Sequence, residues 1–219
     1  MVTFDQVRQD KDVMTYIKKA DETLVALGYT EHAFAHVGKC AKEAGELLEQ
    51  LDYPERTAEL ARIAAYLHDI GNVVNRVDHA QSGAMMAFRL LGHMGMEAEE
   101  IARVVAAIGH HDESTAFPVN EVAAAVIIVD KSDVRRSRVR NDDMPSFDIH
   151  DRVNYAVEQS TLTLCKEENT ITLSIIIDSA ISAVMDYFEI FLNRMLLCRK
   201  AAAYFNLKFQ LVINGVALL

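Results

Sequence analysis

The chain has 219 residues, of which 51% are hydrophobic and 25% are charged, with only three prolines and nine glycines. This length suits one sizeable domain with a small appendage, and the composition excludes a disordered chain and a large multidomain protein. The formal net charge is -10, which excludes an overall positive field that would hold a nucleic-acid duplex or an anionic membrane surface.

The cysteine content and the apolar segments predict the cellular compartment of the protein. Cys40, Cys165 and Cys198 are widely spaced and form no CxxC motif, so we expect neither a disulfide framework nor a cysteine zinc site. Acidic residues interrupt the N-terminal segment, where a signal peptide needs an apolar core. Charged residues also interrupt the longest apolar stretch, residues 179–205, which predicts no membrane span. A cytoplasmic protein is the resulting expectation.

Helical periodicity dominates the chain up to about residue 151, with apolar residues at positions i, i+3, i+4 and i+7. A stripe over residues 60–67 predicts a helix that leads into His68 and Asp69 and ends near Gly71.

Three further helices are predicted along the chain. One begins after Asp78 as its N-cap, and a second has a stripe over residues 101–108 and ends in His110-His111. The third covers residues 122–129, and Asp130 lies one turn after Val126 on its apolar side.

After about residue 151 the apolar period changes to two, which indicates strands. Residues 161–164 and 171–177 are separated by a link short enough for a hairpin, and a helix from Ser179 and a strand over residues 209–213 follow. We therefore predict a mainly α protein: a helical domain over residues 1–152 and a small β-β-α-β subdomain, of α+β class, over residues 153–219.

A series of histidines and aspartates supplies candidate ligands for a metal site. A single histidine on an apolar face is more often a hydrogen-bonded core residue than a ligand, but this series is long and ordered. Imidazole and carboxylate without thiolate suit Mn, Fe, Ni, Co or Zn in a site with open water positions. Its members are His36, His68, Asp69, His79, His110, His111 and Asp130.

With these residues the sequence resembles the HD-domain metal-dependent phosphohydrolases, a family named for its adjacent His-Asp pair. The resemblance covers about residues 30 to 140, in the family's order and with similar spacing. The segments that carry it are Ala35-His36-Val37, Tyr66-Leu67-His68-Asp69-Ile70-Gly71, His79 with Ser82-Gly83-Ala84, Ile108-Gly109-His110-His111 and Ile128-Val129-Asp130-Lys131-Ser132-Asp133.

The resemblance implies an HD-domain helical bundle in which His36, His68, Asp69 and Asp130 hold a first divalent metal ion. In similar proteins that also have histidines at the positions of His79, His110 and His111, a second metal is bound and the aspartate of the pair bridges the two. The implied cofactors are therefore two divalent ions of Mn, Fe, Ni, Co, Mg or Zn.

The sequence departs from the family's patterns at three points, two of which narrow the substrate and one of which removes a candidate for a phosphate contact. The paired histidines are not followed by the Gly-Tyr-Pro signature of members that cleave cyclic di-GMP. The acidic pair of the hydrolases of stringent-response nucleotides is absent after the His-Asp motif, which counts against that substrate too. Many members have a lysine three residues after the aspartate of the pair, where this chain has Asn72.

The predicted function is hydrolysis of a nucleotide or another small phosphate ester, as a phosphomonoesterase or a phosphodiesterase. A divalent metal lowers the pKa of bound water toward ~7 and polarises a phosphoryl oxygen. We assign the catalytic roles to His68 and Asp69, with Asp69 as the bridging ligand. The alternative is a nucleotide-binding or regulatory dimer with a retained metal core and little turnover.

Substrate contacts are predicted at the one basic cluster, which follows Asp130. Lys131 and Arg135 lie one helical turn apart and nearest to that ligand, and a solvated surface is the other interpretation of the cluster. His32, one turn before His36, is a third candidate for a substrate contact or lies at the rim of the site.

The C-terminal strands allow two interpretations. Exposed edges of a small sheet invite pairing with a second copy of the chain, which predicts a homodimer. Packing against the helical domain of the same chain is the alternative.

Overall fold

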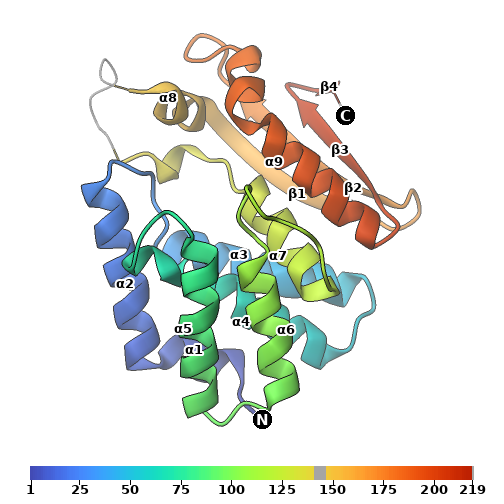
Figure 1. Ribbon diagram of the computed structural model, residues 1–219. Coiled ribbons are helices and arrows are strands. Elements are labelled where there is room, and N and C mark those ends of the chain that lie inside the picture. Colours follow the sequence, from blue (N-terminus) through green and yellow to red (C-terminus); the bar gives the residue numbers. More distant parts are fainter. Residues whose placement is uncertain (141–146, 219) are drawn as a thin grey trace. The chain divides into compact units, whose positions relative to one another are not determined.

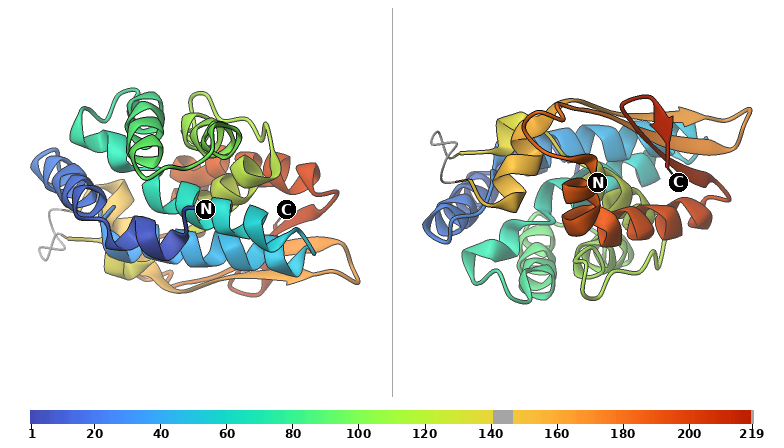
Figure 2. Two further views of the ribbon diagram at one scale, coloured as in Figure 1. Left: turned by 90° about the horizontal axis from the view of Figure 1, so that it is seen from below. Right: turned by 90° about the horizontal axis from the view of Figure 1, so that it is seen from above.

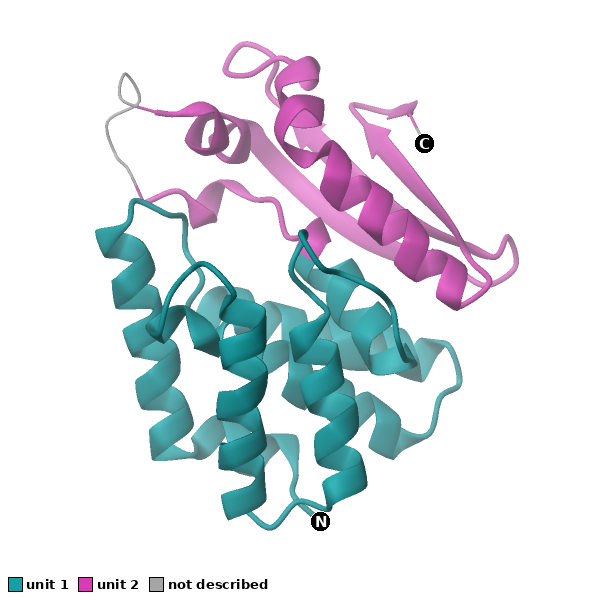
Figure 3. Cartoon of the chain, viewed as in Figure 1, with its two compact units in different colours: residues 1–130 teal, residues 131–219 magenta. Residues whose placement is uncertain are grey.

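The computed structural model of the protein describes residues 1–140 and 147–218. The chain forms two compact units, residues 1–130 and 131–219, which Figure 3 colours separately. The first unit is helical and the second combines helices with a small sheet, as Figure 1 shows. The predicted fold class, mainly α with a small α+β appendage, is thereby confirmed. The predicted division into a helical domain of residues 1–152 and a subdomain of residues 153–219 stays a prediction.

Seven α-helices and one 3-10 helix make up the described first unit, with α7 running two residues past it. In chain order they are α1 (Phe4–Gln9), α2 (Lys11–Ala26), α3 (Phe34–Gln50), α4 (Glu55–Leu67), the 3-10 helix η1 (Ile70–Val73), α5 (His79–His93), α6 (Ala98–Gly109) and α7 (Glu121–Ser132).

Apolar stripes explain how these helices pack. On α3 the buried residues Val37, Cys40, Ala44 and Leu48 follow the helical period, and α3 packs against α4. Helices α5 and α6 lie side by side in Figures 1 and 2, and η1 packs against both α2 and α5. Residues 122–129 of α7 are fully buried, as expected of a helix that is apolar all round.

The second unit contains the remaining elements. They are the 3-10 helix η2 (Arg136–Arg138), α8 (Ile149–Ala156), β1 (Val157–Cys165), β2 (Thr170–Ile177), α9 (Val184–Tyr204), β3 (Lys208–Ile213) and β4 (Val216–Ala217).

The four strands form one sheet in the order β1-β2-β3-β4. Strands β1 and β2 form an antiparallel hairpin, whereas β2 and β3 are parallel, with Leu173 opposite Leu211. The residues of β2 and β3 that point to one face are buried, and α9 packs against β3. Helix α9 runs along the sheet in the views of Figures 1 and 2. It is thus the crossover that parallel strands require.

Two details differ from the prediction. The helix expected from Ser179 begins at Val184, because residues 178–182 form a turn in which Asp178 accepts hydrogen bonds from the backbone N–H groups of Ala180, Ile181 and Ser182. A short fourth strand, β4, pairs with β3 beyond the turn at residues 214–215. In the described part of the chain, no helix combines the length and apolar character of a membrane span.

Candidate metal centre

The His-Asp pair lies where α4 ends and η1 begins. His68 follows the last residue of α4, and Asp69 leads into η1 with φ -94° and ψ 1°, which turns the chain away from the helix axis. Both side chains are buried, His68 completely. The backbone turn therefore directs two adjacent polar side chains into the interior of the helical unit.

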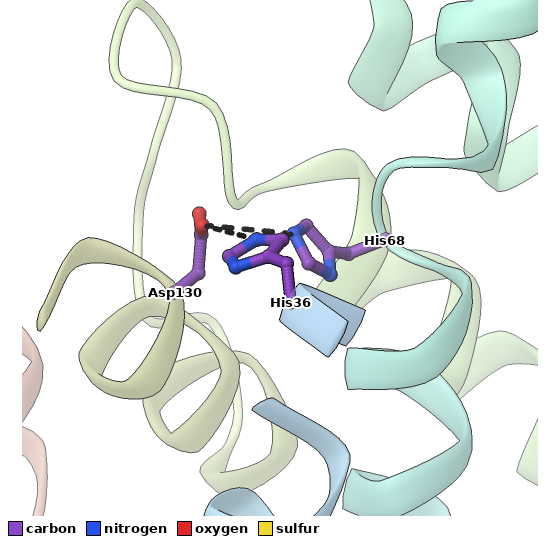
Figure 4. A group of neighbouring side chains, drawn as sticks. All are labelled: His36, His68 and Asp130. Atoms are coloured by element: carbon purple, nitrogen blue, oxygen red, sulfur yellow. Dashed lines mark hydrogen bonds and ion pairs between the residues drawn. The ribbon is translucent and has the colours of Figure 1, made fainter. Parts of the chain in front are cut away.

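His36 and Asp130 come from α3 and α7 to meet this pair. The Nε2 atom of His36 lies 3.3 Å from Nε2 of His68 and 3.4 Å from Oδ1 of Asp130. The Oδ2 atom of Asp69 lies 3.3 Å from Nε2 of His68 and 3.7 Å from Nε2 of His36. Figure 4 shows the side chains of His36, His68 and Asp130 pointing toward one another. These four residues form the first half of the centre.

The second half of the centre lies around Oδ1, the other carboxylate oxygen of Asp69. The Oδ1 atom is 3.5 Å from Nε2 of His79 and 3.9 Å from Nε2 of His111, and these two nitrogen atoms are 3.2 Å apart. His79 is the first residue of α5, and His111 follows the end of α6. The carboxylate of Asp69 therefore lies between two histidine pairs, with one oxygen toward each.

Backbone carbonyls orient three of the rings. The Nδ1 atoms of His68, His79 and His111 lie 2.7, 3.0 and 2.6 Å from the carbonyl oxygens of Ala65, Arg76 and Ile108. A carbonyl only accepts, so each Nδ1 carries the ring proton, and in the neutral ring the Nε2 lone pair points into the centre. Such hydrogen bonds are the usual way in which a metal-binding histidine is oriented.

Burial and charge act against each other in this centre. Burial lowers the pKa of His68, but Asp69 and Asp130 outweigh it and raise that pKa to about 10. Burial likewise raises the pKa of the Asp69 carboxyl, but His68 outweighs it and holds the pKa well below its ordinary value. The buried carboxylate of Asp69 and the partly exposed carboxylate of Asp130 thus favour a positive charge between them.

The residues present fit a divalent metal ion. Two pairs of Nε2 atoms lie 3.3 and 3.2 Å apart, and carboxylate oxygens lie on the same centre. Ring nitrogen atoms this close in a buried position need a cation or a proton between them. Nitrogen and oxygen donors without thiolate suit Mn, Fe, Co, Ni or Zn. Burial also lowers the pKa of His79, which favours the neutral, ligating form.

Four predicted site residues lie apart from these contacts. His110 lines a groove of about 490 Å³ between α5 and α6, and its buried Nδ1 has no hydrogen-bond partner among residues 1–140 and 147–218. The ring of His32 stacks edge-on against that of His36 at 5.5 Å. Lys131 is buried next to Asp130 in the sequence, and Arg135 forms an ion pair with Asp133. Substrate contacts by His32, Lys131 and Arg135 stay predictions.

The structure adds contacts of two residues that the sequence does not predict. Asn72 donates from Nδ2 to Oδ1 of Asp69 at 2.9 Å, and the NH1 group of Arg76 lies 3.9 Å from the same oxygen. Arg76 sits three residues before His79, and this position within the ligand series is the only signal that points to it.

Comparisons with known proteins find a family and a solved structure that are similar to part of this chain. Residues 33–136 match the family of the HD domain. A crystal structure described as a predicted HD superfamily hydrolase from an uncultured Thermotogales bacterium is 25% identical to this chain. The alignment covers 57% of this chain and 68% of that chain, with a TM-score of 0.46. No curated protein matches the chain.

Proposed function

Because residues 33–136 are matched as an HD domain, we propose that the protein is a metal-dependent phosphohydrolase that acts on a nucleotide or another small phosphate ester. The observation that carries the proposal is the position of Asp69, whose Oδ2 faces His36 and His68 and whose Oδ1 faces His79 and His111. A carboxylate with a separate histidine pair at each oxygen is suited to bridging two cations. The centre is accordingly proposed to be dinuclear.

The residues divide the work as follows. His36, His68 and Asp130 would hold one divalent ion and His79 and His111 the other, with Asp69 between them. When bound, such ions lower the pKa of a water molecule and polarise a phosphoryl oxygen. The carbonyls of Ala65, Arg76 and Ile108 would fix the imidazole rings before substrate arrives, and burial of the ligands would keep bulk water from competing for them.

The proposed compartment is the cytoplasm. Cys40, Cys165 and Cys198 are present as cysteines rather than as disulfides, and two of them are buried, as suits a reducing environment. A cytoplasmic location also supplies nucleotides and sugar phosphates as candidate substrates.

The test is a comparison of the wild type with Asp69→Asn on a broad panel of nucleotides and phosphate esters in Mn²⁺ or Fe²⁺, with products identified by mass spectrometry. We expect metal-dependent hydrolysis by the wild type and a loss of more than about 100-fold in the variant, because even residues that only orient a ligand contribute about 10- to 100-fold. Asp12→Asn, which changes an exposed carboxylate on α2, is the matched control and should retain activity.

Equal inactivity of wild type and Asp69→Asn across metals and esters would contradict the proposal. If such an inactive wild type still bound nucleotides, the alternative of a binding or regulatory module would take its place.

A further inference from the structure

An arginine reaches the second half of the metal centre. Arg76 lies in the segment between η1 and α5, and its NH1 group is 3.3 Å from Nε2 of His79 and 3.9 Å from Oδ1 of Asp69. Its side chain is 27% exposed, so the guanidinium touches both the buried ligands and solvent. Arg76 is therefore a cation at the boundary between the centre and the surface.

Two neighbours hold Arg76 in this position. NH1 donates to Oδ1 of Asn72 at 3.3 Å, and Asn72 donates in turn to Oδ1 of Asp69. The guanidinium carbon lies 5.5 Å from the centre of the Tyr29 ring, a cation–π distance. Contacts on both sides limit the rotamers of a long side chain and so reduce the entropy that it would lose on binding a ligand.

The hydrogen bonds of Arg76 leave donors unused. Both of its hydrogen bonds to described residues, to Asn72 and His79, involve NH1. Its Nε and NH2 groups donate to no protein atom in residues 1–140 and 147–218, and no carboxylate there lies within hydrogen-bonding distance of the guanidinium. Arg56 differs, because Nε and NH2 both donate to Glu100.

We propose that Arg76 binds the phosphoryl group of the substrate through Nε and NH2, beside the metal centre. This inference rests on the proposed phosphohydrolase function and names the cation that the function needs. A guanidinium presents parallel N–H groups that match two phosphate oxygens, and its charge offsets the negative charge on non-bridging oxygens in the transition state. Asn72 is then the residue that orients Arg76 with respect to Asp69.

The experiment uses the Mn²⁺-loaded full chain with inorganic phosphate as the probe. Arg76→Met, Arg76→Lys and the wild type are compared for phosphate affinity by isothermal titration calorimetry, for hydrolysis of p-nitrophenyl phosphate and bis(p-nitrophenyl) phosphate, and for Mn²⁺ content. Arg89→Met, which removes an exposed arginine from α5, is the matched control.

We expect Arg76→Met to weaken phosphate binding by about 10- to 100-fold, the range for a lost charge-assisted hydrogen-bonded pair. The ratio kcat/KM should fall by a similar factor, while Mn²⁺ content and the melting temperature stay unchanged. Arg76→Lys should lose less phosphate affinity than Arg76→Met, since lysine keeps the positive charge but lacks the parallel N–H groups of the guanidinium. The lysine variant also replaces Arg76→Met in the comparison if the methionine variant fails to fold.

Three outcomes would overturn the inference. One is phosphate affinity within twofold of the wild type in Arg76→Met. Another is a loss of Mn²⁺ in that variant, which would make Arg76 a residue that positions Asp69 and His79. The third is a loss of phosphate affinity in Arg89→Met that equals the loss in Arg76→Met. If the wild type hydrolyses neither ester, the proposed function fails for these esters, and the phosphate titration still decides the role of Arg76.

Discussion

At the scale of single residues, one ion pair connects three parts of the helical unit. Arg56, at the start of α4, donates from Nε to Glu100 of α6 at 2.6 Å and from NH1 to the carbonyl of Val2 at 2.7 Å. The hydrogen bond from Arg56 lowers the pKa of the Glu100 carboxyl. Both side chains are 20% exposed, so solvent screens the pair only partly.

We predict that Glu100→Gln lowers the free energy of unfolding by about 1 kcal/mol at pH 7, near the upper end of the range for accessible ion pairs. Because the pKa of Glu100 is lower in the folded than in the unfolded state, its contribution is fully present above pH 4.5. It is lost as the pH falls through the folded pKa. Urea unfolding between pH 7 and pH 3 measures both statements.

Glu22→Gln is the control for this pair. The ion pair of Glu22 with Lys19 is exposed, so we expect the variant to resemble the wild type at every pH. If the free energy of unfolding of Glu100→Gln stayed below that of the wild type by a constant amount down to pH 3, the effect would not be ionic.

The residues of the candidate centre each had a signal in the sequence, and Arg76 had almost none. Each of them belongs to a short motif in a fixed order, and His68 and Asp130 also end or continue an apolar stripe, but their role as metal ligands stays a prediction. Arg76 lies in residues 74–78, which have no period, and it approaches His79 only because the chain turns there. The pairing of each Asp69 oxygen with a different histidine pair likewise depends on side-chain direction, which spacing does not encode.

At the scale of elements, a close contact between η1 and α5 brings the two halves of the centre together. A Cβ atom on Gly71 would lie 2.0 Å from the carbonyl oxygen of His79 and 2.4 Å from the backbone nitrogen of Gly83. Both neighbours are backbone atoms of α5, so neither can move aside alone. Only glycine at position 71 allows the observed distance between the two elements.

We predict that Gly71→Ala destabilises the protein by about 1 to 3 kcal/mol, the usual cost of overpacking, and moves His79 away from Asp69. The variant should therefore bind less Mn²⁺ per chain than the wild type. Chemical denaturation and metal analysis of dialysed protein measure the two effects.

Gly92→Ala in α5 is the matched control for this substitution. A Cβ atom there would have no neighbour within 4 Å, and alanine favours a helix over glycine by about 0.5 to 1 kcal/mol. We expect unchanged metal content and equal or higher stability. A Gly71→Ala variant that behaved in the same way would show that the contact is not required.

The helices and strands were predictable from their periods, but their pairing was not. The predicted helix end near His110 agrees with the end of α6, whereas α4 ends at Leu67, four residues before the predicted Gly71, and the separate 3-10 helix η1 follows. The strand period identified β2 and β3, yet it does not say that they are parallel neighbours. That arrangement depends on α9, whose 21 residues are long enough to return the chain to the end of the sheet where β2 begins.

At the scale of the whole molecule, the homodimer expected from the sequence stays a prediction. Strand β1, with nine residues, pairs with β2 and forms one edge of the sheet. A long unpaired edge is suited to pairing with a second copy. Light scattering after size exclusion should give twice the chain mass, and Gln159→Pro in β1, which removes a backbone donor, should shift the mass toward the monomer. A monomeric wild type at high concentration would contradict the prediction.

The spread of the ligands along the chain also has a consequence for protein synthesis. The residues around Oδ1 of Asp69 are complete once His111 has been made, whereas the half around Oδ2 also needs Asp130. Those 19 further positions take about 1 to 4 s at ribosomal rates of about 5 to 20 residues per second. The half of the centre formed with His79 and His111 is therefore the first that a nascent chain can offer to a metal ion.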